Sequence, residues 1–113
     1  MESAYIVKND KYYWDKILED MHFIILHMKD ETKDSLENNP ILIDSMMFRL
    51  IQISENAKHL SEDVKEKNGD IPWMDIYGLR NRIVHDYGNV DYGVVYDTLK
   101  YDIPEVAELM TIE

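Results

Sequence analysis

The sequence predicts an all-α fold, a helical bundle of four to five helices with two long helices lying antiparallel. Apolar residues recur at three- and four-residue intervals along most of the chain, which is the period of an amphipathic helix. Glycine occurs 4 times in 113 residues, between periodic segments or in one short motif, which favours helices over a sheet sandwich. A short loop joins the two longest periodic segments, so the helices that flank it should be antiparallel neighbours.

The first helix is expected from about Asp10 to about Glu37, with Asp10 as a candidate N-cap. Its apolar stripe consists of Tyr13, Ile17, Met21, Ile24 and Met28. The segment Asn38-Asn39-Pro40 then breaks the periodic pattern. The helix should therefore end before this segment.

A second long helix is expected from Pro40, since proline fits the first turn of a helix. Its apolar side carries Ile43, Met47, Leu50, Ser54, Ala57, Leu60 and Val64. Asn68-Gly69-Asp70 is a C-terminal signal, so this helix should end near Lys67.

Three shorter helices are expected in the rest of the chain. The third starts at Pro72 and ends around His85 to Gly88. Asp91 can cap a fourth, and Pro104 starts or kinks a short last helix. Their apolar positions are Ile76, Leu79, Ile83, Val94, Val95, Leu99, Val106, Leu109 and Met110.

Length and composition indicate one domain over residues 1–113. The sequence has no cysteine, which excludes a disulfide scaffold, a thiolate zinc site and a cysteine nucleophile. The apolar runs are far shorter than a membrane helix requires, and the first residues do not read as a signal peptide. We expect a soluble cytoplasmic protein with no membrane association.

The charge is strongly acidic, with 23 acidic and 12 basic residues and a net charge of -11. Such a chain repels a nucleic-acid backbone at long range, while it suits a basic protein partner. The segment around Arg80 differs locally, because Arg80 and Arg82 are two of the three arginines in the chain. A small basic site within an acidic surface therefore stays compatible with an RNA substrate.

The segment Arg80-Asn81-Arg82-Ile83-Val84-His85-Asp86-Tyr87 is the most informative of the chain. It resembles the Arg-x4-His-x-Tyr signature of HepT-like proteins in the HEPN group. Three further features fall where such proteins have them: the segment from Ile53 to Ser61, the Trp73-to-Tyr87 spacing, and Val90-Asp91 with Pro104. The resemblance covers most of the chain.

The resemblance implies a HEPN-type bundle that dimerises and acts as the toxin of a HepT/MntA-type toxin–antitoxin pair. It implies RNA cleavage by Arg80 and His85. A partner nucleotidyltransferase of the MntA type would transfer AMP to Tyr87 and so silence the toxin.

The spacing of Arg80, Asn81 and His85 along a helix determines whether their side chains can reach one target. On one straight helix Asn81 and His85 are about 40° apart and share a face, whereas Arg80 and His85 diverge by about 140°. Helix fraying before Gly88, the long reach of arginine, or a second copy of the motif would bring the two together. A homodimer with its two-fold axis beside this helix is the economical solution.

Arginine and histidine without metal ligands nearby suit cleavage by transesterification. The His85 imidazole can take the proton of a ribose 2′-OH, and Arg80 can stabilise the negative charge that builds on the phosphorane. The products would be a 2′,3′-cyclic phosphate and a 5′-hydroxyl, and no cofactor is required. A purely structural role for Arg80 and His85 in surface or interface hydrogen bonds is the alternative.

The neighbouring motif residues have supporting roles in this hypothesis. The Asn81 amide can hydrogen-bond to His85 one turn later and orient its ring, although a plain surface asparagine is an equal alternative. Tyr87 is the modification residue, with a stacking or core aromatic as the alternative. AMP on Tyr87 would add bulk and negative charge beside the cleft and block RNA.

Glu55 and the histidines outside the motif are further candidate site residues. Glu55 can be a buried partner of the motif or, more plainly, a half-exposed helix glutamate. His22 and His27 are five apart and His59 stands alone, so the histidine spacing predicts no metal site.

Two other functions stay open at this point. The chain can be a catalytically silent helical module that docks a nucleotidyltransferase as its substrate or regulatory subunit. It can also be a structural dimerisation domain.

Overall fold

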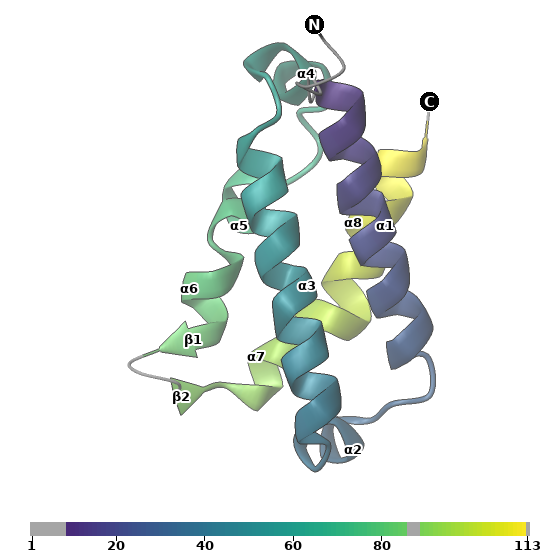
Figure 1. Cartoon of the computed structure of the whole chain (residues 1–113), viewed down its shortest axis with the longest axis vertical. Helices are drawn as coiled ribbons and strands as arrows, with labels where there is room; N and C mark the ends of the chain where they lie inside the picture. Colours follow the sequence, from purple (N-terminus) through teal and green to yellow (C-terminus); the bar gives the residue numbers. More distant parts are fainter. Residues whose placement is uncertain (1–8, 86–88, 113) are drawn as a thin grey trace, which may run out of the picture.

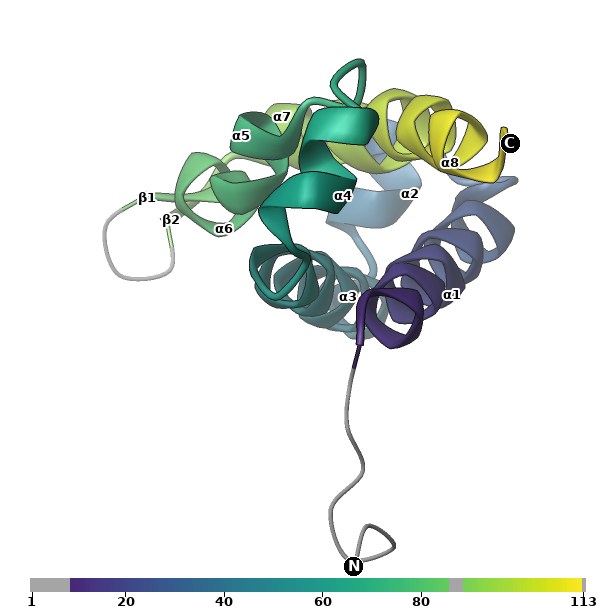
Figure 2. The same cartoon turned by 90° about the horizontal axis from the view of Figure 1, so that it is seen from above.

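Two long helices form one layer of the molecule. The computed structural model describes residues 9–85 and 89–112, and in it α1 (Asp10–Met28) and α3 (Pro40–Lys58) run antiparallel, side by side (Figure 1). The shorter helices cover one side of this pair (Figure 2). The predicted all-α bundle with two long antiparallel helices is confirmed.

The first long helix ends earlier than predicted, at Met28, and α2 (Lys33–Glu37) follows as a separate element. One local contact and one distant contact end it. Thr32 and Ser35 form a reciprocal capping box that starts α2. Lys100 Nζ donates to the carbonyls of residues 28, 29 and 31 at 2.8, 3.0 and 3.3 Å, satisfying acceptors that the end of α1 leaves open.

The N-cap of α1 is Asn9, whose side chain accepts from the N–H of Tyr12, so the assignment of Asp10 as the cap is wrong. Asp10 instead accepts from the backbone N–H of Ser61 at 2.8 Å and from its hydroxyl at 2.7 Å. These hydrogen bonds, the backbone one first, hold the pKa of the Asp10 carboxyl below its usual range. Asp10 thus ties the start of α1 to the segment that follows α3.

The second long helix is also divided. It begins at Pro40 as predicted, with Asn39 as its cap, but it ends at Lys58. Ser61 then caps α4 (Glu62–Lys67) through a hydrogen bond from the N–H of Val64. The cap and its bond to Asp10 redirect the chain, and the predicted end near Lys67 holds for α4.

The third predicted helix is replaced by three short elements. They are α5 (Trp73–Tyr77), α6 (Leu79–Ile83) and a two-stranded antiparallel hairpin of β1 (Val84–His85) and β2 (Asn89–Val90). The expectation that this helix reaches His85 to Gly88 is wrong. Val84 pairs with Val90 in the hairpin register, and β-branched residues such as Ile83 and Val84 favour extended backbone over helix.

The C-terminal segment is helical from Tyr92 to Thr111 but changes its winding. Asp91 caps α7 (Tyr92–Asp97), as predicted. A π-helical turn, η2 (Thr98–Asp102), precedes α8 (Ile103–Thr111). Pro104 lacks an N–H group, so the ordinary bond to the residue four before it is impossible, and a widened turn is the local solution.

The core lies between the α1–α3 layer and the C-terminal helices. The side chains with no exposed surface are Ile17, Met21, Ile24, Leu36, Met46, Ile53, Ala57, Val95 and Leu99. Trp14 Nε1 donates to the carbonyl of Met110 at 3.2 Å and fixes α8 on α1. None of the described helices combines the length and apolar character needed to cross a bilayer.

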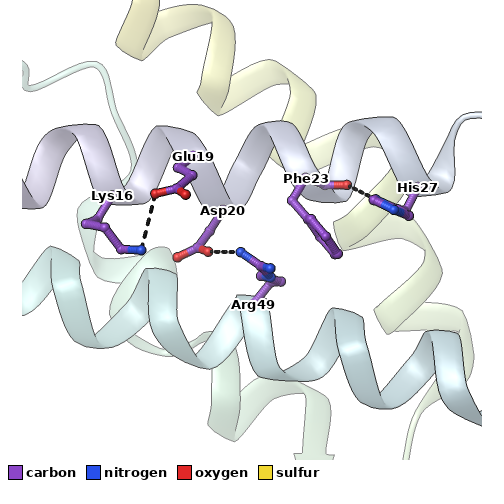
Figure 3. Close-up of polar contacts among 6 residues, drawn as sticks. All are labelled: Lys16, Glu19, Asp20, Phe23, His27 and Arg49. Atoms are coloured by element: carbon purple, nitrogen blue, oxygen red, sulfur yellow. Dashed lines mark hydrogen bonds and ion pairs between the residues drawn. The ribbon is translucent and has the colours of Figure 1, made fainter.

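One charged pair is built into the α1–α3 contact (Figure 3). Arg49 Nη1 on α3 donates to Asp20 Oδ1 on α1 at 2.7 Å, and the Asp20 side chain is 3% exposed. The other carboxylate oxygen, Oδ2, has no hydrogen-bond partner among the described residues. The Arg49 guanidinium also lies 3.8 Å from the centre of the Phe23 ring, so it serves as charge partner and packing surface together.

Replacing Arg49 by methionine should lower the free energy of unfolding by about 2–3 kcal/mol, because Asp20 would stay buried without a counter-charge. Chemical denaturation measured by circular dichroism checks this value. Lys16→Met is the matched control, since Lys16 forms an exposed pair with Glu19, and its removal should cost less than about 0.5 kcal/mol. Equal losses for the two variants would contradict this account, and Asp20→Leu combined with Arg49→Met should recover much of the loss.

Candidate active site

The motif begins on α6, a helix that depends on its neighbours for its position. Its five residues are far fewer than an isolated helix needs to be stable. Ser54 Oγ of α3 donates to the carbonyl of Tyr77 just before it, at 3.0 Å. Leu79 is buried, and Arg82 contacts η2. These three anchors fix where the motif residues lie.

Arg80 and Asn81 are exposed and line a cavity of about 230 Å³ between α6 and α3. The remaining residues of its lining are Ile51, Ser54, Glu55, Lys58 and Tyr77. Within the described part of the chain, Arg80 makes no hydrogen bond or ion pair. Its guanidinium is therefore available to an anion from solvent.

Glu55 is exposed and forms an ion pair with Lys58 at 3.4 Å. Of the two interpretations of this residue, the structure supports the exposed helix glutamate. It lines the same cavity as Arg80, so the site does include it. Its negative charge is partly offset there by Lys58.

Arg82, two residues after Arg80, has a different environment. Its Nη2 donates to the hydroxyl of Thr98 at 3.1 Å and lies 3.6 Å from Asp102 Oδ2, both in η2. It lines a second cavity, of about 150 Å³, together with three carboxylates, those of Asp75, Asp102 and Glu105. The two arginines, expected to contribute alike to local positive charge, thus differ in environment, and their separation of about 160° on a helix is the sequence signal of that difference.

His85 lies outside the helix that carries Arg80. Its backbone is in β1, paired with Asn89, and its side chain is not among the described parts of the chain. The 40° and 140° helical angles to Asn81 and Arg80 therefore do not apply, because the helix ends at Ile83. The angular separation of Arg80 and His85 on a helix therefore no longer argues for a dimer. The hydrogen bond from Asn81 to His85 stays a prediction.

Tyr87 lies outside the described residues.

The other histidines do not form a site in the part that is described. His27 Nδ1 is 2.9 Å from the carbonyl oxygen of Phe23, and His59 stacks on Tyr13. No three His, Asp or Glu side chains in residues 9–85 and 89–112 are grouped so that they could hold a metal ion.

The ribonuclease HepT-like family matches residues 17–111 of the sequence. The chain belongs to this family. The resemblance found in the motif is confirmed, and with it the prediction of an enzyme of the ribonuclease class.

Individual relatives agree with this assignment. A protein of Caldanaerobacter subterraneus subsp. tengcongensis named as a candidate RNase is 29% identical over 100 residues, 88% of this chain and 89% of that protein. A candidate RNase of Methanocaldococcus jannaschii is 36% identical over 90 residues, 80% of this chain and 78% of that protein. A candidate ribonuclease HepT of Thermococcus cleftensis is 35% identical over 54 residues, 48% of this chain and 49% of that protein. No solved structure matches the chain significantly.

Proposed function

We propose that this chain cleaves RNA by transesterification without a metal ion, with Arg80 and His85 as catalytic residues. The observation that carries the proposal is the state of Arg80, which is exposed, makes no ion pair among the described residues and lines a cavity between α6 and α3. The chain leaves α6 at Ile83, and His85 follows two residues later in the hairpin. The arginine and the histidine that the reaction needs thus come from one short segment of the chain, residues 80–85.

The proposed reaction needs a base and a charge-stabilising group. The His85 imidazole takes the proton of the ribose 2′-OH, and the 2′-oxygen attacks the phosphorus while the bond to the 5′-oxygen breaks. Arg80 stabilises the negative charge on the non-bridging oxygens in the transition state. The leaving 5′-oxygen takes a proton from solvent, which leaves a 2′,3′-cyclic phosphate and a 5′-hydroxyl.

Asn81 has a supporting part in this proposal. Its amide is exposed in the same cavity as Arg80, where it can donate to a phosphate oxygen or orient the His85 ring. Lys58 and Glu55 form an ion pair in that cavity, so Arg80 supplies its net positive charge, which favours the phosphate locally although the whole chain carries a net charge of -11.

Cleavage of an RNA oligonucleotide should persist in EDTA and should fall by about 10²-fold or more in His85→Ala and in Arg80→Ala. Mass spectrometry of the products should find a 2′,3′-cyclic phosphate. His22→Ala is the matched control, because His22 is exposed on α1 and should leave the rate unchanged. Wild-type activity in His85→Ala, or a requirement for added magnesium, would contradict the mechanism, while absence of activity in the wild-type chain would favour the silent binding module.

We propose a homodimer that is joined through the outer face of α3. Ile41 and Phe48 are 83% and 57% exposed, values unusual for large apolar side chains, and they fall within about 20° of each other on the helix. Glu55 continues the same stripe and lines the Arg80 cavity. A second copy on this stripe would cover the apolar residues and lie beside both motifs.

Light scattering at micromolar concentration should give the mass of a dimer for the wild-type chain. Phe48→Glu should weaken the association by at least about tenfold, because a charge would replace an apolar side chain in the contact. Leu26→Glu is the matched control, since Leu26 is 67% exposed on α1, away from the stripe. A wild-type monomer, or equal effects of the two substitutions, would remove this interface.

We also propose that the chain is the toxin of a HepT/MntA-type pair and that Tyr87 is its control point. Family membership and the position of Tyr87 two residues after His85 support this. AMP on the tyrosine would place a phosphate near the catalytic residues and repel RNA. The partner would be a nucleotidyltransferase of the MntA type.

Incubation with such a nucleotidyltransferase and ATP should raise the mass of the chain in AMP increments, and Tyr87→Phe should block the increase. Tyr87→Phe should remain toxic on expression and escape neutralisation, while Tyr92→Phe, a nearby tyrosine in α7, should behave as the wild type. Labelling that persists on Tyr87→Phe would sink the idea. Equal neutralisation by a catalytically dead partner would point instead to masking by binding.

A further inference from the structure

We infer that Arg82 is a positioning residue, which sets the orientation of α6 through its hydrogen bond to Thr98 and thereby aims Arg80 at the RNA. The inference rests on the proposed catalytic role of Arg80. It assigns different tasks to the two arginines of the motif: Arg80 contacts the substrate, and Arg82 does not.

The surroundings of Arg82 make it a poor site for an RNA phosphate. Three carboxylates line its cavity, those of Asp75, Asp102 and Glu105, and they oppose the approach of another anion. Part of its guanidinium is already bound, at 3.1 Å from the Thr98 hydroxyl. Arg80, on the other side of the helix, makes no such contact among the described residues.

The Thr98 hydrogen bond is the stronger of the two contacts of Arg82. Thr98 is 1% exposed, so its hydroxyl is held by packing within the π-helical turn. The ion pair with Asp102 is longer, 3.6 Å, and the side chains of Arg82 and Asp102 are 41% and 54% exposed, so solvent screens it. The Thr98 hydroxyl is therefore the contact that holds the last turn of α6 against η2.

Loss of this contact should affect orientation more than folding. Leu79 is buried and Ser54 still binds the carbonyl of Tyr77, so α6 keeps its other anchors. Those anchors lie at and before the first residue of the helix, whereas Arg82 holds its last turn. Without Arg82 the helix can rotate or fray, and a displacement of Arg80 by about 1 Å can lower the catalytic rate by up to about 10²-fold.

The test compares Thr98→Val with Thr98→Ser in steady-state cleavage of a fluorescent RNA oligonucleotide. Valine keeps the shape of threonine but removes the acceptor, whereas serine keeps the hydroxyl. We expect kcat to fall about tenfold in Thr98→Val with KM within about twofold, and Thr98→Ser to restore most of the rate. Thermal melts must show that both variants are folded at the assay temperature. If a Thr98 variant does not fold, Arg82→Gln removes the same hydrogen bond and takes its place in the test.

A double-mutant cycle and salt dependence supply the decisive readouts. The combined Arg82→Gln and Thr98→Val variant should lose little more than either single variant, because both remove the Arg82–Thr98 hydrogen bond and the Asp102 pair is screened by solvent. Arg80→Ala should lower the slope of log affinity against log salt by about one, and Arg82→Gln should leave that slope unchanged.

Two results would overturn the inference: wild-type kcat in folded Thr98→Val, or a raised KM with a lower salt slope in Arg82→Gln, which would make Arg82 a contact of the RNA. Wild-type activity in Arg80→Ala would instead remove the proposed function on which the inference rests. The two failures are thus distinguishable.

Discussion

Helix α3 is the constraint on which the rest of the structure depends, because each of its sides has a separate task. One side packs against α1, where Ile53 and Leu50 are buried and Arg49 binds Asp20 (Figure 3). Another side holds the start of the motif through the bond from Ser54 to the carbonyl of Tyr77. The outer stripe stays exposed with Ile41 and Phe48. A shift of α3 would therefore change the core, the candidate site and the proposed interface together.

Charge is distributed so that a small positive site is compatible with an acidic chain. Several basic side chains are occupied by partners, as Arg49 is by Asp20 and Arg82 is by Asp102. Lys100 donates hydrogen bonds to the backbone carbonyls at the end of α1. Arg80 is the exception among the motif arginines that the structure describes, so of the two it is the one open to an incoming phosphate.

The sequence was sufficient for the fold class because the helical periodicity of α1 and α3 extends over many residues and is averaged over many turns. It was insufficient for the helix ends. Helix α1 ends at Met28 because Lys100, 72 residues away, binds its last carbonyl, and no local pattern reports such a contact. Asn9 instead of Asp10 caps α1 because Asp10 has a distant partner in Ser61.

The same limit applies to the candidate site. The motif identified the family, yet the assumption of one continuous helix gave the wrong relation between Arg80 and His85. The π-helical turn that brings Thr98 to Arg82 arises near Pro104, more than twenty residues beyond the motif arginines, so their different environments had only a weak signal in the sequence.

The change from helix to hairpin at Val84 alters how the proposed catalytic pair, Arg80 and His85, must be understood. On a helix, the direction of His85 would follow from that of Arg80, and convergence would require a second subunit. In the structure the two residues belong to elements with separate supports, since η2 and α3 hold α6 while Val90 and Asn89 pair with β1. The position of His85 relative to Arg80 therefore depends on the hairpin pairing as well as on the anchors of α6. In the proposed mechanism, binding of RNA or of a second copy beside the hairpin would act on the distance between base and cation.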